Sequence, residues 1–252
     1  MEKLRSFLSN DSVFGQLMYR AGIIIGVNLL FILCSIPVFT IGASCTAMYT
    51  VCLKMLRERS KGNIRIIPTF FRAFKSNFIQ ATLGFLGMVA LAAFLFLEIT
   101  WCNQFTPPVS YFRFPLLVLL LFLGVIAIHF FPVLAAFNGT LRQQLTNTLY
   151  FSFTRPLHLI PVLFVHIFPL ALSYVNLQIL PLTAFLWASF GFGAIAMYCS
   201  TFHLKAFRPF LGRVDAAGDP VAKGQENDPN LILSEHDESE ERTLAEMRKF
   251  GL

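Results

Sequence analysis

The sequence predicts an all-α, polytopic integral membrane helical bundle with about six membrane-embedded helices, and three observations lead to this fold class. The chain of 252 residues is 56% hydrophobic and only 13% charged, whereas about a quarter of the residues of soluble domains are charged. Its mean hydropathy is +0.64. It also contains five uncharged apolar runs of about the 20 residues that a helix needs to cross a bilayer.

The five apolar runs cover most of residues 21–199. They comprise residues 21–41, 78–97, 115–137, 157–175 and 179–199, and none contains Asp, Glu, Lys or Arg. We expect each run to form one long span. Residues 21–205 are therefore the predicted transmembrane helical domain.

The charges that flank the first run require one further helix. Residues 54–75 carry seven Lys and Arg against the single acid Glu58, and the segment before residue 21 is also basic. Both segments should be cytoplasmic by the positive-inside rule. One crossing cannot leave both ends inside, so residues 43–56 are predicted to return through the membrane. Fourteen helical residues rise only about 21 Å, which predicts a short return or re-entrant helix. The alternative is five spans with the N-terminus outside.

The two ends of the chain are predicted to be cytoplasmic. Residues 1–20 form an amphipathic N-terminal segment in which Asp11 and Ser12 can cap a helix. Residues 206–252 are expected to be a mostly disordered acidic tail that could form one short terminal helix. Residues 1–213 have a net charge of +12 and residues 214–252 a net charge of −6. Because the cations lie between apolar runs, this partition favours membrane topology over nucleic-acid binding.

The stretch CSIPVFTIGAS, residues 34–44, is predicted to form the hairpin between the first run and the return helix. Pro37 removes a backbone donor and biases the residue before it away from the helical conformation. Thr40 or Ser44 can cap the following helix. The hairpin signature comprises Pro37, Gly42, Ala43, Ser44 and Ala47.

Small residues at a spacing of four predict close helix packing. Gly22 and Gly26 have this spacing in the first run, and Ala43 and Ala47 repeat it in the return segment. Two such motifs on consecutive segments favour a tight hairpin. Further close approaches are expected at Gly84, Gly87, Gly191 and Gly193.

Basic and aromatic residues alternate in residues 69–78, which predicts an interfacial helix. Phe70, Phe71, Phe74 and Phe78 would face lipid, while the cations between them reach phosphates. The candidates for interfacial or partner contact are Lys54, Arg57, Arg59, Arg72 and Lys75.

No catalytic or cofactor-binding motif is present, so we expect neither an enzyme nor a bound cofactor or metal. His129 and His166 fall within spans, where a lone imidazole more often hydrogen-bonds a neighbour than ligates a metal. The five cysteines are interpreted as small buried hydrophobic residues. The spans hold no acid, which argues against an ion-coupled pump. The polar side chains that could bond across helices are Asn28, Gln80, Thr82, Ser173 and Thr183.

Four blocks of the chain resemble the YesL-like bacterial membrane proteins, a family defined by a domain of unknown function. These blocks are DSVFGQLMYRAG, NLLFILCSIPVFTIGASCTAMY, FFRAFKSNFIQAT and HFFPVLAAF, and they lie in order between about residues 11 and 200. The resemblance implies a location in the bacterial plasma membrane. It also implies an association with carbohydrate importers of the ABC type, whose permease or ATPase subunits would be partners.

The function that this resemblance implies is that of an accessory or regulatory component of oligosaccharide uptake. The alternative is a small-solute channel or uncoupled carrier, lined by the polar residues of the helical hairpin. The lipid bilayer is a partner in either case, and nucleic acid in neither.

Overall fold

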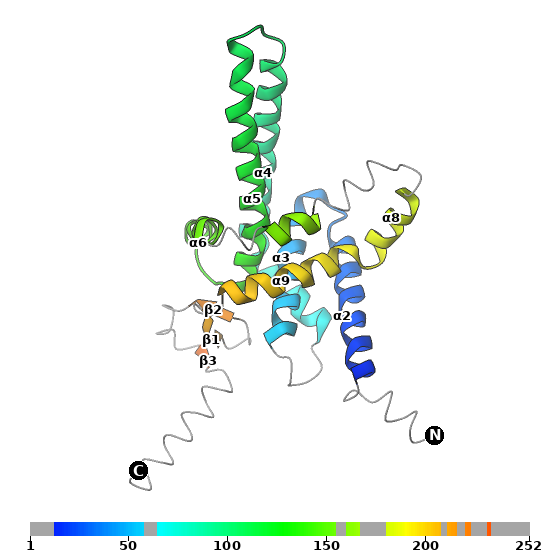
Figure 1. The fold of residues 1–252 in the computed structure, drawn as a ribbon. Coiled ribbons are helices and arrows are strands. Elements are labelled where there is room, and N and C mark those ends of the chain that lie inside the picture. Colours follow the sequence, from blue (N-terminus) through cyan, green and yellow to red (C-terminus); the bar gives the residue numbers. More distant parts are fainter. Residues whose placement is uncertain are drawn as a thin grey trace, which may run out of the picture.

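The chain folds as an assembly of long helices, with one small sheet at one end (Figure 1). The computed structural model describes residues 13–57, 65–154, 160–166, 180–207, 211–215, 220–222 and 231–232. The long helices are α2 (Val13–Cys34), α3 (Ile41–Arg57), α4 (Ile66–Cys102), α5 (Arg113–Ala136), α6 (Leu141–Thr154) and α9 (Phe192–Phe207). The shorter ones are η1 (Val38–Thr40), η2 (Val109–Phe112), α8 (Leu180–Leu186) and the π-helix η4 (Trp187–Gly191), and residues 160–166 are also helical.

Five helical segments of the described residues are long and apolar enough to cross a membrane. They are Leu17–Cys34, Val38–Arg57, Ile66–Cys102, Val109–Ala136 and Leu180–Phe207. The polytopic helical fold predicted from hydropathy is thus confirmed. Of the predicted span 157–175, residues 160–166 are helical, and the remainder lies outside the described residues.

The predicted return helix is longer than the 14 residues expected from the sequence. It comprises η1 and α3, which together extend over 20 residues from Val38 to Arg57. At about 1.5 Å per residue in α3 and 2 Å in η1, this segment is close to the thickness of the hydrocarbon. It therefore has the length of a full span rather than of a re-entrant helix.

Helix α3 is the centre of the assembly. In the candidate span that contains α3, 72% of the residues are buried inside the protein. In the other four candidate spans the buried share is 6–22%. It packs against α2, α4, α5 and α9. Its sequence, IGASCTAMYTVCLKMLR, is rich in small and hydroxyl-bearing residues, and these let neighbouring helix backbones approach closely.

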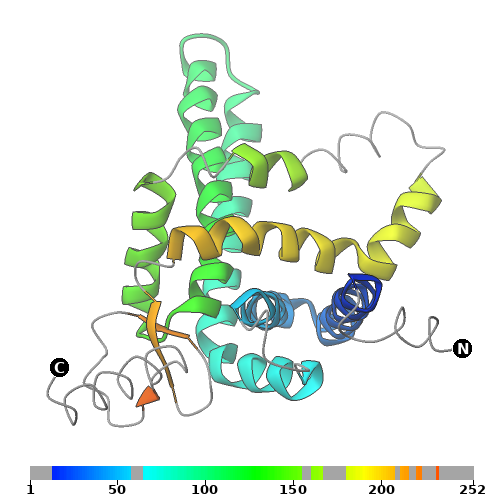
Figure 2. The same cartoon turned by 60° about the horizontal axis from the view of Figure 1, so that its bottom comes forward.

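Helices α4 and α5 form a long hairpin that projects beyond the rest of the molecule (Figure 1). The 37 residues of α4 correspond to about 55 Å, which exceeds the roughly 30 Å of hydrocarbon. In Figure 2 the first turns of α4 run at an angle to its remainder. Ser76 Oγ and Asn77 Nδ2 both donate to the carbonyl oxygen of Ala73, each over 3.1 Å. Such competition for a helix carbonyl is a recognised cause of bending.

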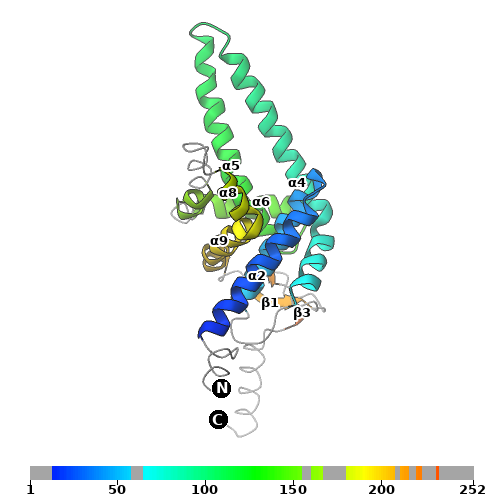
Figure 3. The ribbon, with the colours of Figure 1, turned by 90° about the vertical axis from the view of Figure 1, so that its right-hand side faces the viewer.

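Helix α9 crosses α3 and α5 instead of running alongside them (Figures 1 and 2). Figure 3 shows α2 beside the start of α4, with α8 and α9 on the other side of α2. The buried core joins these helices through Val27 of α2, Val51 of α3, Phe70 of α4, Val133 of α5 and Phe207 of α9, each fully buried.

The segment 206–252 contains structure that the sequence did not predict. Strand β1 (Leu211–Asp215) pairs antiparallel with β2 (Pro220–Ala222) and with β3 (Leu231–Ile232), in the order β2-β1-β3. The sheet lies near the end of α5 (Figure 1). The expected terminal helix lies outside the described residues.

Candidate functional site

The polar side chain of Asn28 links the first span to the last. Asn28 is fully buried in α2. Its Nδ2 donates to the carbonyl oxygens of Trp187 (3.2 Å) and Ala188 (2.8 Å), and its Oδ1 accepts from the backbone N–H of Gly193 (3.0 Å). These backbone groups belong to the π-helix η4 and to the residues that follow it. A π-helix breaks the regular i to i−4 ladder, and Asn28 supplies the partners for the displaced groups.

The bonds to Asn28 determine whether the backbone carbonyls of η4 are available to bind an ion or a substrate. Broken helices in transporters present unwound carbonyls and helix ends that coordinate ions or substrate. Here the amide of Asn28 occupies that position, so the carbonyls of Trp187 and Ala188 are already hydrogen-bonded. The geometry favours a fixed contact between helices at η4 over an open ion site.

A second polar contact of this kind joins α4 to the turn after α5. Gln80 Nε2 donates to the carbonyl oxygen of Gly139 over 2.9 Å, and Gln144 Nε2 donates to the carbonyl oxygen of Phe137. Thr140 and Gln143 form a reciprocal capping pair at the start of α6, in which the Thr140 N–H donates to Gln143 Oε1 over 2.8 Å. Gln144 was not among the polar side chains expected to bond across helices. It directly follows Gln143, the second residue of the capping pair.

The remaining polar candidates have different outcomes. Thr183 Oγ1 donates to the carbonyl oxygen of Leu180 in its own helix, and the hydroxyl of Thr82 has no hydrogen-bond partner among the described residues. Ser173 lies outside the described residues. Of the five, Asn28 and Gln80 therefore confirm the expectation of bonds between separate segments.

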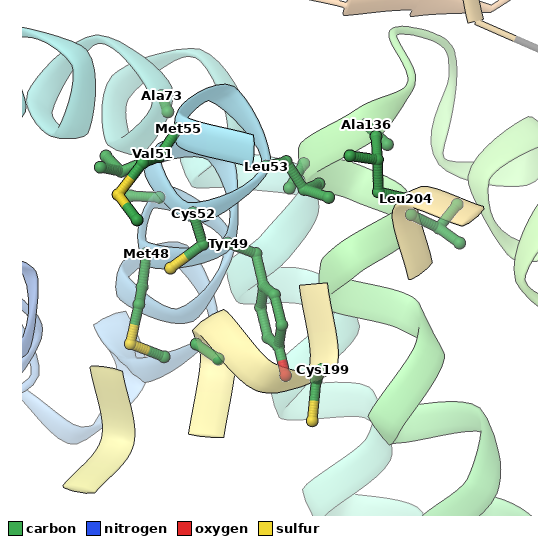
Figure 4. Packing of buried hydrophobic residues seen from close by; sticks show 14 of the residues in the cluster. Met48, Tyr49, Val51, Cys52, Leu53, Met55, Ala73, Ala136, Cys199 and Leu204 are labelled. Atoms are coloured by element: carbon green, nitrogen blue, oxygen red, sulfur yellow. The ribbon is translucent and has the colours of Figure 1, made fainter. Parts of the chain in front are cut away.

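Tyr49 connects the central helix α3 to α9. In Figure 4 its ring extends from α3 and its hydroxyl lies beside Cys199. Cys199 is fully buried and Tyr49 nearly so. Because Cys52 is buried on α3 as well (Figure 4), these cysteines are packing residues, as expected from the sequence. All five cysteines are free thiols.

The fold brings together two histidines that are far apart in the sequence. The rings of His129 on α5 and His203 on α9 lie edge to face, with centroids 5.3 Å apart. His203 also contacts Tyr49 at 6.2 Å and stacks on Phe207 at 5.7 Å. His129 Nδ1 lies 3.0 Å from the carbonyl oxygen of Val125, and the equivalent atom of His166 lies 2.8 Å from that of Val162.

This histidine pair was not predicted, because the sequence places His203 near the membrane interface. No group of three or more His, Cys, Asp or Glu in the described residues could hold a metal ion. The two rings are part of an aromatic cluster between α3, α5 and α9, which is a packing arrangement.

The hairpin signature is located at the contact between α2, α3 and α4. Pro37 is exposed and precedes η1 with φ −75° and ψ 107°. The hydroxyl of Thr40 is shared between the carbonyl oxygens of Cys34 (2.5 Å) and Pro37 (2.6 Å). Thr40 thus satisfies the end of α2. Ser44 does not cap α3, since its buried hydroxyl has no hydrogen-bond partner among the described residues.

The small residues of the signature allow α4 to approach α3. Ala43 and Ala47 are fully buried. A Cβ added to Gly42 would overlap the carbonyl oxygen of Ala81 and lie 2.7 Å from Cβ of Phe85. Gly42 is therefore required at the crossing of these two helices.

The other glycines differ in their surroundings. A Cβ on Gly193 would lie 2.6 Å from the carbonyl oxygen of Ile24, and one on Gly84 would overlap the ring of Phe130. On Gly26 it would lie 3.5 Å from Ile66 Cδ1, an ordinary contact, and on Gly22 or Gly87 it meets nothing within 4 Å. The structure thus gives Gly22 no close neighbour among the described residues.

The basic candidates separate into two groups. Lys54 and Arg57 are half-buried in the last turn of α3, and Arg59 lies outside the described residues. Arg72 and Lys75 are exposed on α4. Helix α3 ends and α4 begins at the end of the molecule opposite the loop between α4 and α5 (Figure 1).

The four phenylalanines beside these cations were expected to face lipid, and for Phe70 this expectation is wrong. Phe70 is fully buried in the core, and Phe74 and Phe78 are half-buried. Only Phe71 of the four is exposed. Phe70 contacts the rings of Phe71 and Phe74 at centroid distances of 5.8 and 6.4 Å. Phe70, with Phe74 packed beside it, therefore joins the start of α4 to the buried core.

Comparison with known proteins gives one family and one curated relative. Residues 24–99, which include α3 and the hairpin, match the family model described as "Protein of unknown function, DUF624". The chain is 30% identical over 130 residues to "Uncharacterized protein YesL" of Bacillus subtilis (strain 168), a match that covers 51% of this chain and 59% of that protein. No solved structure matches. Residues 24–99 thus resemble the DUF624 family, and the chain is similar to YesL over about half of its own length and three fifths of that protein.

Proposed function

We propose that this protein is a non-enzymatic component of a bacterial plasma membrane that assists or regulates oligosaccharide import by an ABC-type transporter. The association with sugar import is what the resemblance to YesL-like proteins implies. Both termini are cytoplasmic in this proposal, so the end of α3 is accessible to the cytoplasmic parts of a permease or to an ATPase subunit.

The observation that supports a regulatory contact is the position of α3. This helix is the most buried of the candidate spans, and its last turn carries Lys54 and Arg57. A partner that binds these cations would act on a helix packed against α2, α4, α5 and α9. Closely packed cores transmit small displacements. A contact that shifts one end of α3 would therefore also shift the helices packed against it.

Several polar groups of the interior are engaged in packing or in bonds to the protein's own backbone. In the described residues, the buried His129 and His203 are engaged in ring contacts, and the π-helix carbonyls nearest Asn28 are hydrogen-bonded. Thr46 and Thr50 donate to carbonyl oxygens of their own helix.

Co-purification and uptake test the proposal together. Tagged full-length protein is purified in mild detergent from its own organism, and the importer permease and ATPase are measured in the eluate. We expect both subunits to be recovered with the wild type and to be lost with the triple variant K54Q/R57Q/R59Q. The variant R20Q/R142Q/K205Q, which removes three exposed cations elsewhere, should retain them.

Uptake of a labelled oligosaccharide supplies the functional readout. Deletion of the gene should lower uptake, and the wild type and the R20Q/R142Q/K205Q control should restore it. Unchanged uptake in the deletion strain, together with no importer subunit in any eluate, contradicts the proposal.

A small-solute channel or uncoupled carrier is the second candidate, and one observation favours it. The hydroxyl groups of Ser44 on α3 and Ser200 on α9 are fully buried and lack a hydrogen-bond partner among the described residues. Such groups could line a polar path. Flux of sugars or ions into liposomes containing the purified protein, lowered by S44A/S200A, would support this candidate, and no flux under any gradient would exclude it.

A further inference from the structure

The exposed face at the start of α4 combines three cations with large apolar side chains. Arg65, Arg72 and Lys75 are all exposed: Arg72 and Lys75 are three positions apart on one face of α4, and Arg65 immediately precedes the helix in an extended conformation. Ile67 is 60% exposed and Phe71 is 40% exposed between them. The opposite face, with Phe70 and Ala73, is buried against the core.

This basic face continues directly into a lipid-facing surface of the same helix. Continuing from Lys75 at the helical spacing of three to four residues leads to Ile79, Leu83 and Leu86, which are 71%, 55% and 45% exposed. In a membrane these three side chains contact acyl chains. Arg72 and Lys75 then lie one to two turns from them, at the depth of the lipid headgroups.

We propose that Arg65, Arg72 and Lys75 form a binding site for the phosphate headgroups of anionic phospholipids in the leaflet that faces the α3–α4 end of the molecule. The three cations supply charge complementarity, and each basic side chain at a membrane surface contributes to the attraction of anionic lipid. Ile67 and Phe71 insert at the same depth, as apolar residues of interfacial helices do.

The apolar neighbours distinguish this occupant from an acidic protein. A lipid satisfies both kinds of side chain at once, because its phosphate pairs with the cations and its acyl chains cover the exposed Ile and Phe. The stripe from Arg65 to Leu86 has cations at one end and aliphatic side chains at the other. That order matches a phospholipid lying along the helix, with its headgroup at Lys75 and its acyl chains at Ile79 and Leu83.

The lipid site is separate from the α3 cations used in the proposed function. Lys54 and Arg57 belong to the end of the central helix, whereas Arg72 and Lys75 lie on α4 and Arg65 immediately precedes it. The two proposals therefore fail independently, because one is measured by importer recovery and the other by lipid selectivity.

Lipid selectivity in reconstituted bilayers tests the site. Full-length protein is placed in bilayers containing a trace of spin-labelled phosphatidylglycerol or spin-labelled phosphatidylcholine, and the fraction of motionally restricted label is measured by electron paramagnetic resonance. We expect wild-type protein to prefer phosphatidylglycerol, and this preference to fall with rising salt. Removal of each cation should lower the relative affinity by about fivefold, so R65Q/R72Q/K75Q should abolish the preference.

Three further variants make the result specific. R20Q/R142Q/K205Q removes the same net charge and should retain the preference. R65K/R72K keeps the charge and should retain it as well, and Phe71→Ser should weaken the restriction of both labels. A thermal unfolding profile of each variant in detergent verifies that the bundle is intact.

Several outcomes would overturn the proposal. Equal loss of preference in both charge-neutralising triple variants would assign the effect to net charge rather than to this face. An undiminished preference in R65Q/R72Q/K75Q would exclude the site. Displacement of the labelled lipid by millimolar inorganic phosphate, or by a peptide of residues 235–241 (EHDESEE), would show that a free anion or the acidic tail is the true occupant.

Discussion

The backbone N–H of Gly193 donates a hydrogen bond of 3.0 Å to Oδ1 of Asn28, across 165 positions of sequence. The same residues also touch sterically, since a Cβ on Gly193 would lie 3.3 Å from Cβ of Asn28. The bond and the close approach depend on each other: Gly193 lets α9 come near α2, and Asn28 then satisfies the backbone that the π-helix η4 leaves without its regular partners.

Replacing Asn28 with leucine should therefore loosen the contact between the first and last spans. Three hydrogen bonds are lost, and each contributes about 0.6 kcal/mol on average inside a membrane, so the expected destabilisation is about 1–2 kcal/mol. Thermal unfolding in detergent measures it. Thr100→Val, which removes an exposed hydroxyl bonded to its own helix, is the matched control. Equal unfolding temperatures for the two variants would contradict the role of Asn28.

Two glycines of the α3–α4 region should respond in opposite ways to alanine. Gly42→Ala forces a methyl group against Ala81 and Phe85, and overpacking of this kind costs about 1–3 kcal/mol. Gly87→Ala meets open space and should be neutral or slightly stabilising, because alanine favours helix over glycine by about 1 kcal/mol. Chemical denaturation of both variants in mixed micelles measures the difference. A stable Gly42→Ala variant would disprove the tight crossing.

The hydroxyl of Thr40 should stabilise the turn between α2 and α3. Thr40→Val keeps the shape but removes the donor to the carbonyl oxygens of Cys34 and Pro37, with an expected loss of about 1 kcal/mol. Thr40→Ser retains the hydroxyl and should behave as the wild type. Limited proteolysis or thermal unfolding can compare the three proteins. A Thr40→Val variant as stable as the wild type, with Thr40→Ser destabilised, would assign the effect to the methyl group instead of the hydrogen bonds.

The orientation in the membrane is a prediction from the flanking charges that can be tested directly. Ser60→Cys lies in the basic segment between α3 and α4, and Gln104→Cys lies at the far end of the α4–α5 hairpin (Figure 1). In a background with Cys102 replaced by serine, a membrane-impermeant maleimide added to whole cells should label position 104 and leave position 60 unlabelled. After lysis both should react. Labelling of both positions from one side would contradict the alternating topology.

The lengths and composition of the spans were readable from the sequence because each span must be apolar over its whole length, whatever it packs against. The return of the chain after Pro37 followed from the charges on both sides of the first run. Asn28 and Gln80 were identifiable as bridging residues, since a polar side chain in hydrocarbon needs a partner. Their partners, the π-helix carbonyls and Gly139, were not identifiable.

Tertiary structure alone decided which apolar surfaces face the protein and which face lipid. Hydrophobicity does not distinguish the two in a membrane, because lipid tails are as apolar as leucine. For this reason Phe70 was expected in lipid and lies in the core. Gly22, whose motif predicted close packing, has open space around it, whereas Gly42 and Gly193 are at the real crossings.

The sequence by itself thus determined that this chain crosses a bilayer several times, where it turns after the first span, and which end of the molecule is basic. Only the three-dimensional fold shows that α3 is the central helix and that the rings of His129 and His203 are in contact. It also shows that Asn28 hydrogen-bonds the backbone carbonyls of the π-helix in the last span. The physical reason is the same throughout. Transfer into hydrocarbon depends on composition, which is local in sequence, whereas contacts between helices depend on shape and on partners that lie 59 to 165 positions away for Gln80 and Asn28.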